Sequence, residues 1–263
     1  MTVTELKTFP ENLEFITRFD YIPGNEDLYS RKSKLFLLQD VQTKKKYIAK
    51  RVIGNQYHEN EWKMPSRIDD SRIIQFTHII HDAEYHYMVS EYGEFQDLFS
   101  THADQSGKLD EGDLLNILKK MAECIKLCHD HKILHLDIKM ENFLVSQKDP
   151  LEIILIDFGF ARDSSDTQME NPNGTDLYVS PEVMSDLTCS EKSDIFSLGM
   201  VMLHLTTTTD HMTSKKRIYT FKKSKKFSEK YKDLITSMIK GQPSERPIID
   251  QVLEGVSETL CNT

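Results

Sequence analysis

Four polar side chains of the kinds that bind metal ions and phosphate lie within 21 residues of this chain: Asp137, Lys139, Asn142 and Asp157. A run of Phe-Leu-Val follows Asn142, and a run of Ile-Ile-Leu-Ile precedes Asp157. Short apolar runs of this kind are typical of β-strands that face a core. If the two strands pair, the loop before the first lies beside the end of the second. The spacing therefore predicts that Asn142 and Asp157 share one metal ion, while Asp137 and Lys139 project from the same loop.

This combination suits phosphoryl transfer, which needs a hard cation on the polyphosphate, a carboxylate that orients the attacking hydroxyl, and positive charge near the migrating phosphate. The segment His-Leu-Asp-Ile-Lys-Met-Glu-Asn, followed later by Asp-Phe-Gly, resembles the H-R-D-x-K-x-x-N and D-F-G patterns of the protein kinase family. The resemblance implies that ATP is bound with Mg²⁺ or Mn²⁺. It makes Asp137 the catalytic base, Lys139 the stabiliser of the transferred phosphate, and Asn142 and Asp157 the metal ligands.

The resemblance extends from about residue 15 to residue 255 and implies one α+β kinase domain with two lobes. A β-rich N-lobe with one short helix is expected over residues 1–93, and a mainly helical C-lobe over residues 94–263. The apolar patterns predict a hairpin of residues 34–38 and 46–50, strands at 73–76 and 85–89, and helices at 109–131, 229–240 and 246–260. Asp110 or Asp113 is expected to cap the first of these helices.

The N-lobe supplies the residues expected to hold the nucleotide phosphates. Ile-Ala-Lys, which ends at Lys50, resembles the V-A-I-K strand of the family, and this makes Lys50 the residue that holds the α- and β-phosphates. Its partner is Glu61 or Glu59, and the spacing to the following strands favours Glu61. Because Pro65 follows closely, the helix that carries this glutamate is expected to have only about two to three turns.

The chain departs from the family pattern where a glycine-rich loop is expected. Counting back from Lys50 places that loop near residues 28–33, which contain no glycine, and Gly24 lies too early. Glycines in such a loop let backbone N–H groups approach the phosphates closely. We therefore expect a stiffer or displaced lid and weaker nucleotide binding, with Arg31 or Lys32 as candidates to compensate by charge.

Met-Val-Ser-Glu-Tyr-Gly, residues 88–93, resembles the strand and hinge where kinases bind adenine. The backbone carbonyl of Glu91 and the N–H and carbonyl of Gly93 are then expected to read the purine edge. Ser90 takes the gatekeeper position, and its small size predicts a back pocket open to bulky ATP-competitive inhibitors. The apolar residues expected to sandwich the base are Leu35, Ala49 and Leu144.

Gly-Thr-Asp-Leu-Tyr-Val-Ser-Pro-Glu, residues 174–182, resembles the G-T-x-x-Y-x-A-P-E segment of the family. The resemblance implies that Thr175 bonds Asp137 and Lys139, which is a trait of serine/threonine kinases. It also implies that Glu182 pairs with Arg246.

Three further expectations concern the catalytic loop. Leu136 stands where the family often has an arginine that binds a phosphate of the activation loop, so no such phosphorylation is expected to be needed. His135 is expected to pack beneath Phe158. Asp194, in Ser-Asp-Ile-Phe-Ser-Leu-Gly, is expected to bind the backbone of the catalytic loop.

The charge of the chain bears on its partners. Asp97 and Glu141 occupy positions where kinases that favour basic substrates carry acidic residues, and the net charge is −9. A protein substrate rich in Arg and Lys is therefore expected, and direct binding to nucleic acid is not. The local exception is a run of eight basic residues within 215–230. Contact with an anionic surface is one interpretation of this run, and a solvated, loosely ordered loop is the preferred one.

Composition and termini bound the cellular context. No apolar run is long enough to span a membrane, and Met-Thr-Val-Thr-Glu-Leu-Lys lacks the pattern of a signal peptide. An intracellular protein, in the cytoplasm or the nucleus, is therefore expected. Its four cysteines are expected to be free thiols.

Two alternatives to an active protein kinase stay open. The missing glycines and the short helix favour a pseudokinase or scaffold, although Lys50, Asp137, Lys139, Asn142 and Asp157 are all present. A small-molecule kinase is the other alternative. The small size, glycine-free lid and short helix also resemble compact viral kinases.

Overall fold

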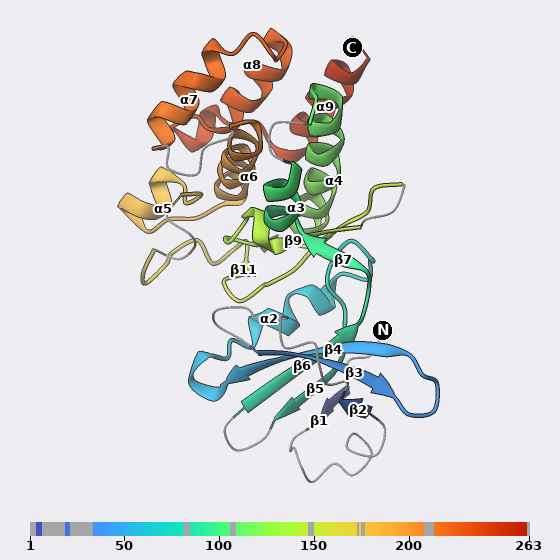
Figure 1. Ribbon diagram of the computed structural model, residues 1–263. Helices are drawn as coiled ribbons and strands as arrows, with labels where there is room; N and C mark the ends of the chain where they lie inside the picture. The colour runs from blue at the N-terminus through green and yellow to red at the C-terminus, as the bar shows by residue number, and fades with distance from the viewer. Residues whose placement is uncertain are drawn as a thin grey trace. The chain divides into compact units, whose positions relative to one another are not determined.

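The computed structural model describes residues 4–6, 19–21, 34–81, 85–105, 109–146, 150–172, 174, 177–207 and 213–261. These residues form two compact units that divide between Glu94 and Phe95, one residue from the expected lobe boundary. Figure 1 shows that the first unit is built on a β-sheet and the second is mainly helical, as the predicted α+β fold requires. No helix among the described residues is both long and apolar enough to cross a bilayer.

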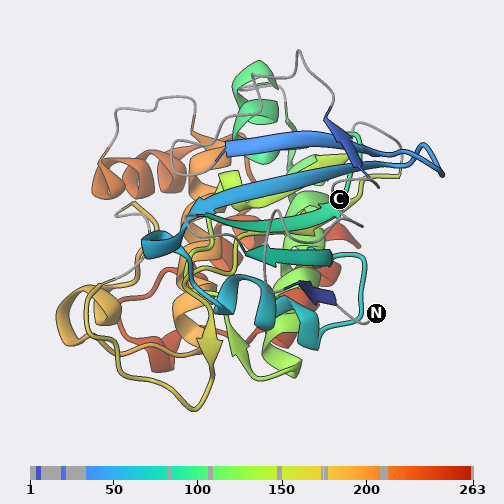
Figure 2. The same ribbon diagram turned by 90° about the horizontal axis from the view of Figure 1, so that it is seen from below.

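The first unit is a six-stranded sheet in the order β1-β5-β6-β4-β3-β2. The long β3–β4 hairpin, beside β6, is seen clearly in Figure 2. It confirms the predicted hairpin, and its polar turn closes where Asp40 Oδ1 accepts hydrogen bonds from the N–H groups of Gln42 and Thr43 over 2.9 and 2.8 Å. The elements of this unit are β1 (Thr4–Leu6), β2 (Phe19–Tyr21), β3 (Lys34–Asp40), β4 (Lys46–Ile53), η1 (Gly54–Gln56), α2 (Asn60–Lys63), η2 (Pro65–Arg67), β5 (Phe76–His81) and β6 (Tyr85–Glu91).

Two predictions for this unit need correction. The strand expected at 73–76 begins only at Phe76, because the Gln75 side chain donates to the carbonyl oxygens of Ile68, Asp70 and Ile73 and holds this segment as a loop. The helix expected to have two or three turns is a single turn, α2. Pro65 starts a separate 3₁₀ turn directly after it, because proline has no N–H with which to continue the α-helical ladder.

The second unit is organised around α4 and α6. α4 confirms the predicted amphipathic helix, and Asp110 begins it with a capping box in which Asp113 is the reciprocal partner. α4 packs against α6 and α9, and its apolar face is fully buried. The elements of this unit are β7 (Phe95–Asp97), α3 (Leu98–Gln105), α4 (Glu111–Asp130), β8 (Ile133–Leu134), η3 (Met140–Asn142), β9 (Phe143–Ser146), β10 (Ile153–Leu155), β11 (Arg162–Asp163), α5 (Pro181–Asp186), α6 (Glu191–Thr206), α7 (Ser214–Lys223), α8 (Glu229–Met238), η4 (Pro243–Glu245) and α9 (Ile249–Leu260).

The basic run was expected to be a loop, and this prediction is wrong. Residues 214–223 form α7, which Thr213 caps by accepting a hydrogen bond from Lys216 N–H through its side chain. The helix forms because two large side chains four residues apart, Arg217 and Phe221, are buried on one face of it. The cysteines are free thiols, three of them buried and Cys261 exposed.

Candidate active site

The loop that carries Asp137 is closed by the predicted strand pair. β9 and β10 are antiparallel, with Phe143 opposite Leu155, and the next step of the ladder is a 2.9 Å hydrogen bond from Ile156 N–H to the carbonyl oxygen of Asn142. Asn142 therefore lies beside the end of β10, immediately before Asp157. The strand pairing on which the expected metal site depends is confirmed.

Asp137 is the centre of the hydrogen bonds in this loop. Its side chain is buried, and Lys139 Nζ and Asn142 Nδ2 both bind its Oδ2, the latter over 3.0 Å. Asn142 Nδ2 also donates to the backbone carbonyl oxygen of Asp137 over 2.8 Å. The three side chains thus hold one another, and a lysine ammonium lies directly beside the candidate base.

Asp194 on α6 holds the backbone that precedes Asp137. Its two carboxylate oxygens accept hydrogen bonds from the N–H groups of His135 (3.0 Å) and Leu136 (2.8 Å), and His129 Nε2 binds it over 3.0 Å. Leu136 has a φ of +62°, an unfavourable conformation for a residue other than glycine, and these bonds offset its cost. Burial alone would raise the pKa of Asp194, but the hydrogen bond from His129 and the nearby imidazoles keep that pKa below its ordinary value. The predicted anchoring of the loop is confirmed.

The Asp-Phe-Gly segment is fixed from the same side. His135 Nε2 binds the carbonyl oxygen of Ile156 over 3.1 Å, and its ring meets the buried Phe158 ring edge to face, with centroids 4.7 Å apart. His135 therefore packs against Phe158, as predicted. Asp157, between these contacts, has a φ of +65°, which an aspartate tolerates better than most residues.

The residues present fit a magnesium ion that also binds phosphate. Among the described residues, no three His, Cys, Asp or Glu side chains gather into a metal site. Mg²⁺ does not need such a cage, because in nucleotide sites one or two carboxylates are joined by phosphate oxygens and water. The Nδ2 of Asn142 is used by Asp137, so its oxygen is the atom left to join Asp157 as a hard ligand.

The activation segment, which runs from Asp157 to Glu182, approaches the loop of Asp137 at Gly174. Gly174 has a φ of +108°, and a Cβ at this position would lie 3.2 Å from the carbonyl oxygen of Leu136 and 3.9 Å from Asp137 Oδ1. Only glycine allows both the conformation and the close approach. Thr175, expected to bond Asp137 and Lys139, lies outside the described residues.

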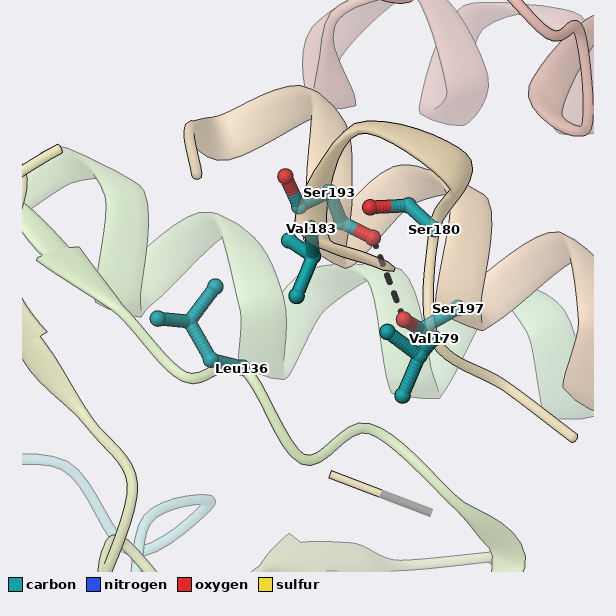
Figure 3. A pocket seen from close by; sticks show the side chains of 6 residues that line it. All are labelled: Leu136, Val179, Ser180, Val183, Ser193 and Ser197. Carbon is teal, nitrogen blue, oxygen red and sulfur yellow. Dashed lines mark hydrogen bonds between the residues drawn. The ribbon is translucent and has the colours of Figure 1, made fainter. Parts of the chain in front are cut away.

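A small pocket lies where the catalytic loop, the end of the activation segment and α6 meet (Figure 3). Serines on α6 let the segment approach: Ser197 Oγ donates to the carbonyl oxygen of Tyr178 over 2.8 Å, and Ser193 Oγ donates to Glu182 Oε1 over 2.9 Å. The walls of the pocket are formed by Leu136, Val179, Ser180, Val183, Ser193 and Ser197. The pocket belongs to the packing that seats residues 177–183 on α6.

Glu182 and Arg246 form the predicted ion pair, and both are buried. The contact is bidentate, with Arg246 Nη1 and Nη2 lying 2.8 and 2.7 Å from the two carboxylate oxygens. Arg246 also donates to the carbonyl oxygens of Lys192, Lys240 and Gly241. Burial by itself would raise the pKa of Glu182, but the hydrogen bonds from Arg246 and the backbone outweigh it and lower that pKa.

In the first unit, Lys50 contacts Glu61 and not Glu59. Lys50 Nζ binds Glu61 Oε1, with the glutamate buried and the lysine half-buried. Glu59 is exposed and pairs with Lys63 instead. The short α2 is therefore sufficient to bring Glu61 to β4.

The residues expected around adenine do not all lie on the same face of the sheet as Lys50. Successive side chains of a strand point to opposite faces, and residues directly opposite on neighbouring strands share a face. Leu35 lies opposite Lys50, and Ser90 lies opposite Ile48, so these side chains share one face.

Ala49 lies on the other face of the sheet, and this corrects the expectation that it lines the nucleotide site together with Lys50. Its side chain is packed in a core cluster with Leu38, Tyr47, Ile80 and Val89. Ile48, two residues before Lys50, is the residue of this strand that shares the Lys50 face. Because side chains alternate along a strand, the residue two positions before Lys50, and not the one directly before it, shares its face. The sequence alone could therefore have identified Ile48.

The remaining expected residues lie in both units. Glu91 ends β6, its side chain binds Lys45, and Gly93 follows it before the end of the first unit. Leu144 is half-buried in β9, opposite Asp97 of β7. The Asp97 carboxylate accepts hydrogen bonds from Ser100 N–H and Oγ over 2.8 and 2.7 Å, whereas Glu141 is exposed in η3. The glycine-free window 28–33 lies outside the described residues.

Sequence reasoning missed His129, which binds Asp194 from α4. It is a buried histidine at the end of an otherwise apolar helical face, and that position is the only signal the sequence offers. Histidines there are more often packed in the core than bound to a carboxylate, so the partner had to come from the fold.

Comparison with known proteins agrees with this geometry. Residues 31–256 match the model of the protein kinase domain. The chain is 26% identical over 239 residues to an Aurora kinase of Patiria pectinifera and 27% identical over 239 residues to Aurora kinase A-B of Xenopus laevis, covering 88% of this chain and 58% of each relative. It is 29% identical over 178 residues to myosin light chain kinase A of Dictyostelium discoideum, covering 64% of this chain and 60% of that protein. The chain thus spans about three fifths of the length of these relatives.

The family model covers most of the chain, and the geometry of the catalytic loop described above agrees with it. This chain therefore belongs to the protein kinase family.

Proposed function

We propose that the chain is a serine/threonine protein kinase that transfers the γ-phosphate of Mg-ATP to basic protein substrates. The observation that carries this proposal is the buried Asp137 carboxylate, which Lys139 and Asn142 bind. The backbone of its loop is fixed by hydrogen bonds to Asp194. Such preorganisation serves a reaction in which positioning and charge stabilisation supply most of the catalysis. A loop with no chemical role would have no need to bury this carboxylate beside an ammonium.

Each residue has a separate role in the proposed reaction. Asp137 accepts the proton of the substrate hydroxyl as its oxygen attacks the γ-phosphorus and ADP leaves. Lys139, beside that carboxylate, stabilises negative charge on the transferred phosphate. Asn142 and Asp157 would hold Mg²⁺, which lowers the charge repulsion at the polyphosphate.

Nucleotide binding is assigned to residues of the first unit and to Leu144. Lys50, oriented by Glu61, holds the α- and β-phosphates. The backbone of Glu91 and Gly93 reads adenine, and Ser90 is the gatekeeper. Within the first unit, Leu35 and Ile48 contact the base, with Ile48 replacing Ala49 because of the face on which it lies. Leu144 of the second unit is assigned to the base by the resemblance to the family alone.

The serine/threonine preference and the preference for basic substrates belong to the same proposal. Lys139, two residues after Asp137, is the serine/threonine form of the catalytic loop. The similar proteins include two Aurora kinases and a myosin light chain kinase, whose names are compatible with a protein substrate. Exposed Glu141 is the side chain best placed to attract a substrate cation. Asp97 contributes less, because Ser100 already binds both of its carboxylate oxygens.

The test compares matched peptides as substrates with radiolabelled ATP. Arginine-rich peptides that contain Ser, Thr or Tyr at one position, and an acidic Ser peptide, are incubated with wild type, with Asp137→Asn and with the control Asp130→Asn at an exposed position of α4. We expect phosphate in the basic Ser and Thr peptides only, its loss by at least about 1000-fold in Asp137→Asn, and no loss in the control. Equal rates on acidic peptides, or Tyr labelling, would refute the proposed specificity.

A pseudokinase is the second candidate, and the absence of glycine from residues 28–33 favours it. In that case Mg-ATP binds weakly or not at all and no peptide is labelled. Calorimetric titration of Mg-ATP into wild type and Lys50→Met, alongside the peptide assay, separates an inactive protein from an enzyme with a different substrate.

A further inference from the structure

The outer face of α7 carries a stripe of lysines around one exposed tyrosine. The side chains at positions 215, 216, 219, 222 and 223 are spaced three, four and seven residues apart, which places them on one side of an α-helix. All five are exposed, and Tyr219 is 65% exposed. We call this set the lysine stripe: Lys215, Lys216, Tyr219, Lys222 and Lys223.

The opposite face of α7 fixes this orientation. Arg217 and Phe221 are fully buried, and the Phe221 ring lies 5.6 Å from that of Phe227 and 5.9 Å from that of Tyr231. α7 contacts α6, and it cannot turn its lysines inward without exposing these aromatic side chains. The stripe is therefore presented by a rigid element.

The stripe lacks the counter-charges that other lysines of the chain have. Within the part of the chain that the structure describes, none of its four lysines forms an ion pair. By contrast, Lys63, Lys126 and Lys232 pair with carboxylates three or four residues away in the chain. Three more exposed lysines, at 225, 226 and 230, follow the stripe, and residues 215–230 contain only one acidic residue, Glu229.

Folding alone does not account for this arrangement. Lys215 and Lys216 occupy the first turn of α7, which has no acidic residue, although the helix dipole disfavours cations there. A large aromatic side chain is exposed in the middle of the charges. Residues that lower the stability of a helix, with no contact inside the protein to offset their cost, are expected at functional sites.

We propose that the lysine stripe docks a short acidic segment of a partner protein. The stripe spans about 12 Å of helix, the length of a few extended peptide residues. The rest of the chain is strongly acidic, since the net charge is −9 although this segment is basic. Four ammonium groups on so short a surface match the clustered carboxylates of a short acidic peptide, and competition with DNA and with anionic vesicles in the test below distinguishes these larger polyanions from it.

The chemistry of the stripe fits such a peptide. The lysines supply ammonium groups to carboxylates on both sides, and Tyr219 supplies a flat apolar contact of the kind that anchors interfaces. None of these residues belongs to the machinery proposed for phosphoryl transfer, so the surface is independent of that proposal. Its partner is a protein recognised through clustered Asp and Glu next to an apolar side chain.

The test measures anisotropy of a fluorescein-labelled peptide rich in Asp and Glu with one central Leu. The variant Lys216→Gln/Lys222→Gln/Lys223→Gln is compared with Lys44→Gln/Lys132→Gln/Lys240→Gln, which removes the same charge at exposed lysines elsewhere. We expect the stripe variant to bind about tenfold more weakly, and Tyr219→Ala about threefold more weakly, while the control stays within about twofold. Circular dichroism verifies that each variant is folded.

Three results would overturn the proposal. One is the absence of saturable binding to wild type, and another is an equal loss in the control variant, which would mean that only net charge matters. The third is displacement of the peptide at lower concentration by a DNA oligonucleotide, or by phosphatidylserine vesicles, than by unlabelled peptide.

Discussion

The side-chain amide of Asn142 donates hydrogen bonds to both the backbone carbonyl oxygen and the carboxylate of Asp137, over 2.8 and 3.0 Å. Both acceptors belong to one residue, so the amide group has a single orientation in the buried loop. The relationship links two functions of the loop, because the residue that would bind the metal also orients the candidate base.

Replacing Asn142 by Ala should therefore damage metal binding and catalysis together. We expect the Mg²⁺ dependence of the rate to shift by at least about tenfold and kcat to fall by about 100-fold, since a ligand and a support of Asp137 are both removed. The measurement is peptide phosphorylation over a range of Mg²⁺ concentrations. Asn116→Ala, at an exposed position of α4, serves as the control and should match wild type. An unchanged Mg²⁺ dependence in Asn142→Ala would remove Asn142 from the metal site.

The glutamates at 59 and 61 provide a matched pair for testing the nucleotide site. Glu61→Gln weakens the contact that orients Lys50, and we expect kcat/KM for ATP to fall by about 100-fold. Glu59→Gln removes only an exposed ion pair with Lys63, and activity should stay within about twofold of wild type. If the two variants lose activity equally, Lys50 does not depend on Glu61.

The Glu182–Arg246 pair should control stability in the second unit. Glu182→Gln leaves a buried arginine without its anion, and breaking a buried pair in this way costs about 3–5 kcal/mol of unfolding free energy. Urea unfolding at pH 7 measures this difference. Glu245→Gln, at an exposed position one residue before Arg246, is expected to change stability by less than about 0.5 kcal/mol.

The difference in unfolding free energy between wild type and Glu182→Gln should also depend on pH. Because the pKa of Glu182 is lowered in the folded protein, its contribution is present above the ordinary glutamate pKa of about 4.3 and is lost as the pH falls through the lower folded value. The stability gap between wild type and Glu182→Gln should therefore be largest near neutral pH and should narrow below about pH 4. A gap that stays constant down to pH 3 would show that the carboxylate charge does not contribute.

Leu136 should make activity independent of phosphorylation in the activation segment. It packs in an apolar cluster with Leu134, Met169, Val183 and Cys189, so the segment is held without a charged residue at this position. We expect phosphatase-treated and untreated protein to have the same kcat within about twofold. Leu136→Ala should lower the unfolding free energy by about 2–5 kcal/mol, because it leaves a cavity in this cluster. A large loss of activity after phosphatase treatment would contradict this role.

Ser90 should control access for bulky ATP-competitive inhibitors. It is buried on the Lys50 face of the sheet, and Ser90→Met fills that position with a longer side chain. We expect inhibitors with bulky substituents to lose at least about tenfold in potency, which corresponds to about 1.4 kcal/mol, while inhibitors without such groups lose little. Ser66→Met, at an exposed position, is the control. Equal potency against Ser90→Met and wild type would exclude Ser90 as the gatekeeper.

Local sequence determined the catalytic loop and the main elements of each unit. Two short apolar runs between Asn142 and Asp157 predicted β9 and β10, and pairing them predicted the proximity of Asn142 and Asp157. Asp110 and the spacing of apolar residues predicted the start and the buried face of α4. These predictions succeeded because they depend on residues close together in the chain, where period and capping are visible in the sequence.

Only the tertiary structure decided which face of a strand or helix meets which neighbour. Alternation along β4 shows that Ala49 and Lys50 point to opposite faces, but the cross-strand partners had to show that Ala49 faces the core. The basic run became α7 because Phe221 packs against Tyr231 of the next helix, and His129 of α4 binds Asp194, which is 65 residues away in the chain. Contacts of this kind depend on how distant segments pack, and the residues nearby in sequence carry no record of them.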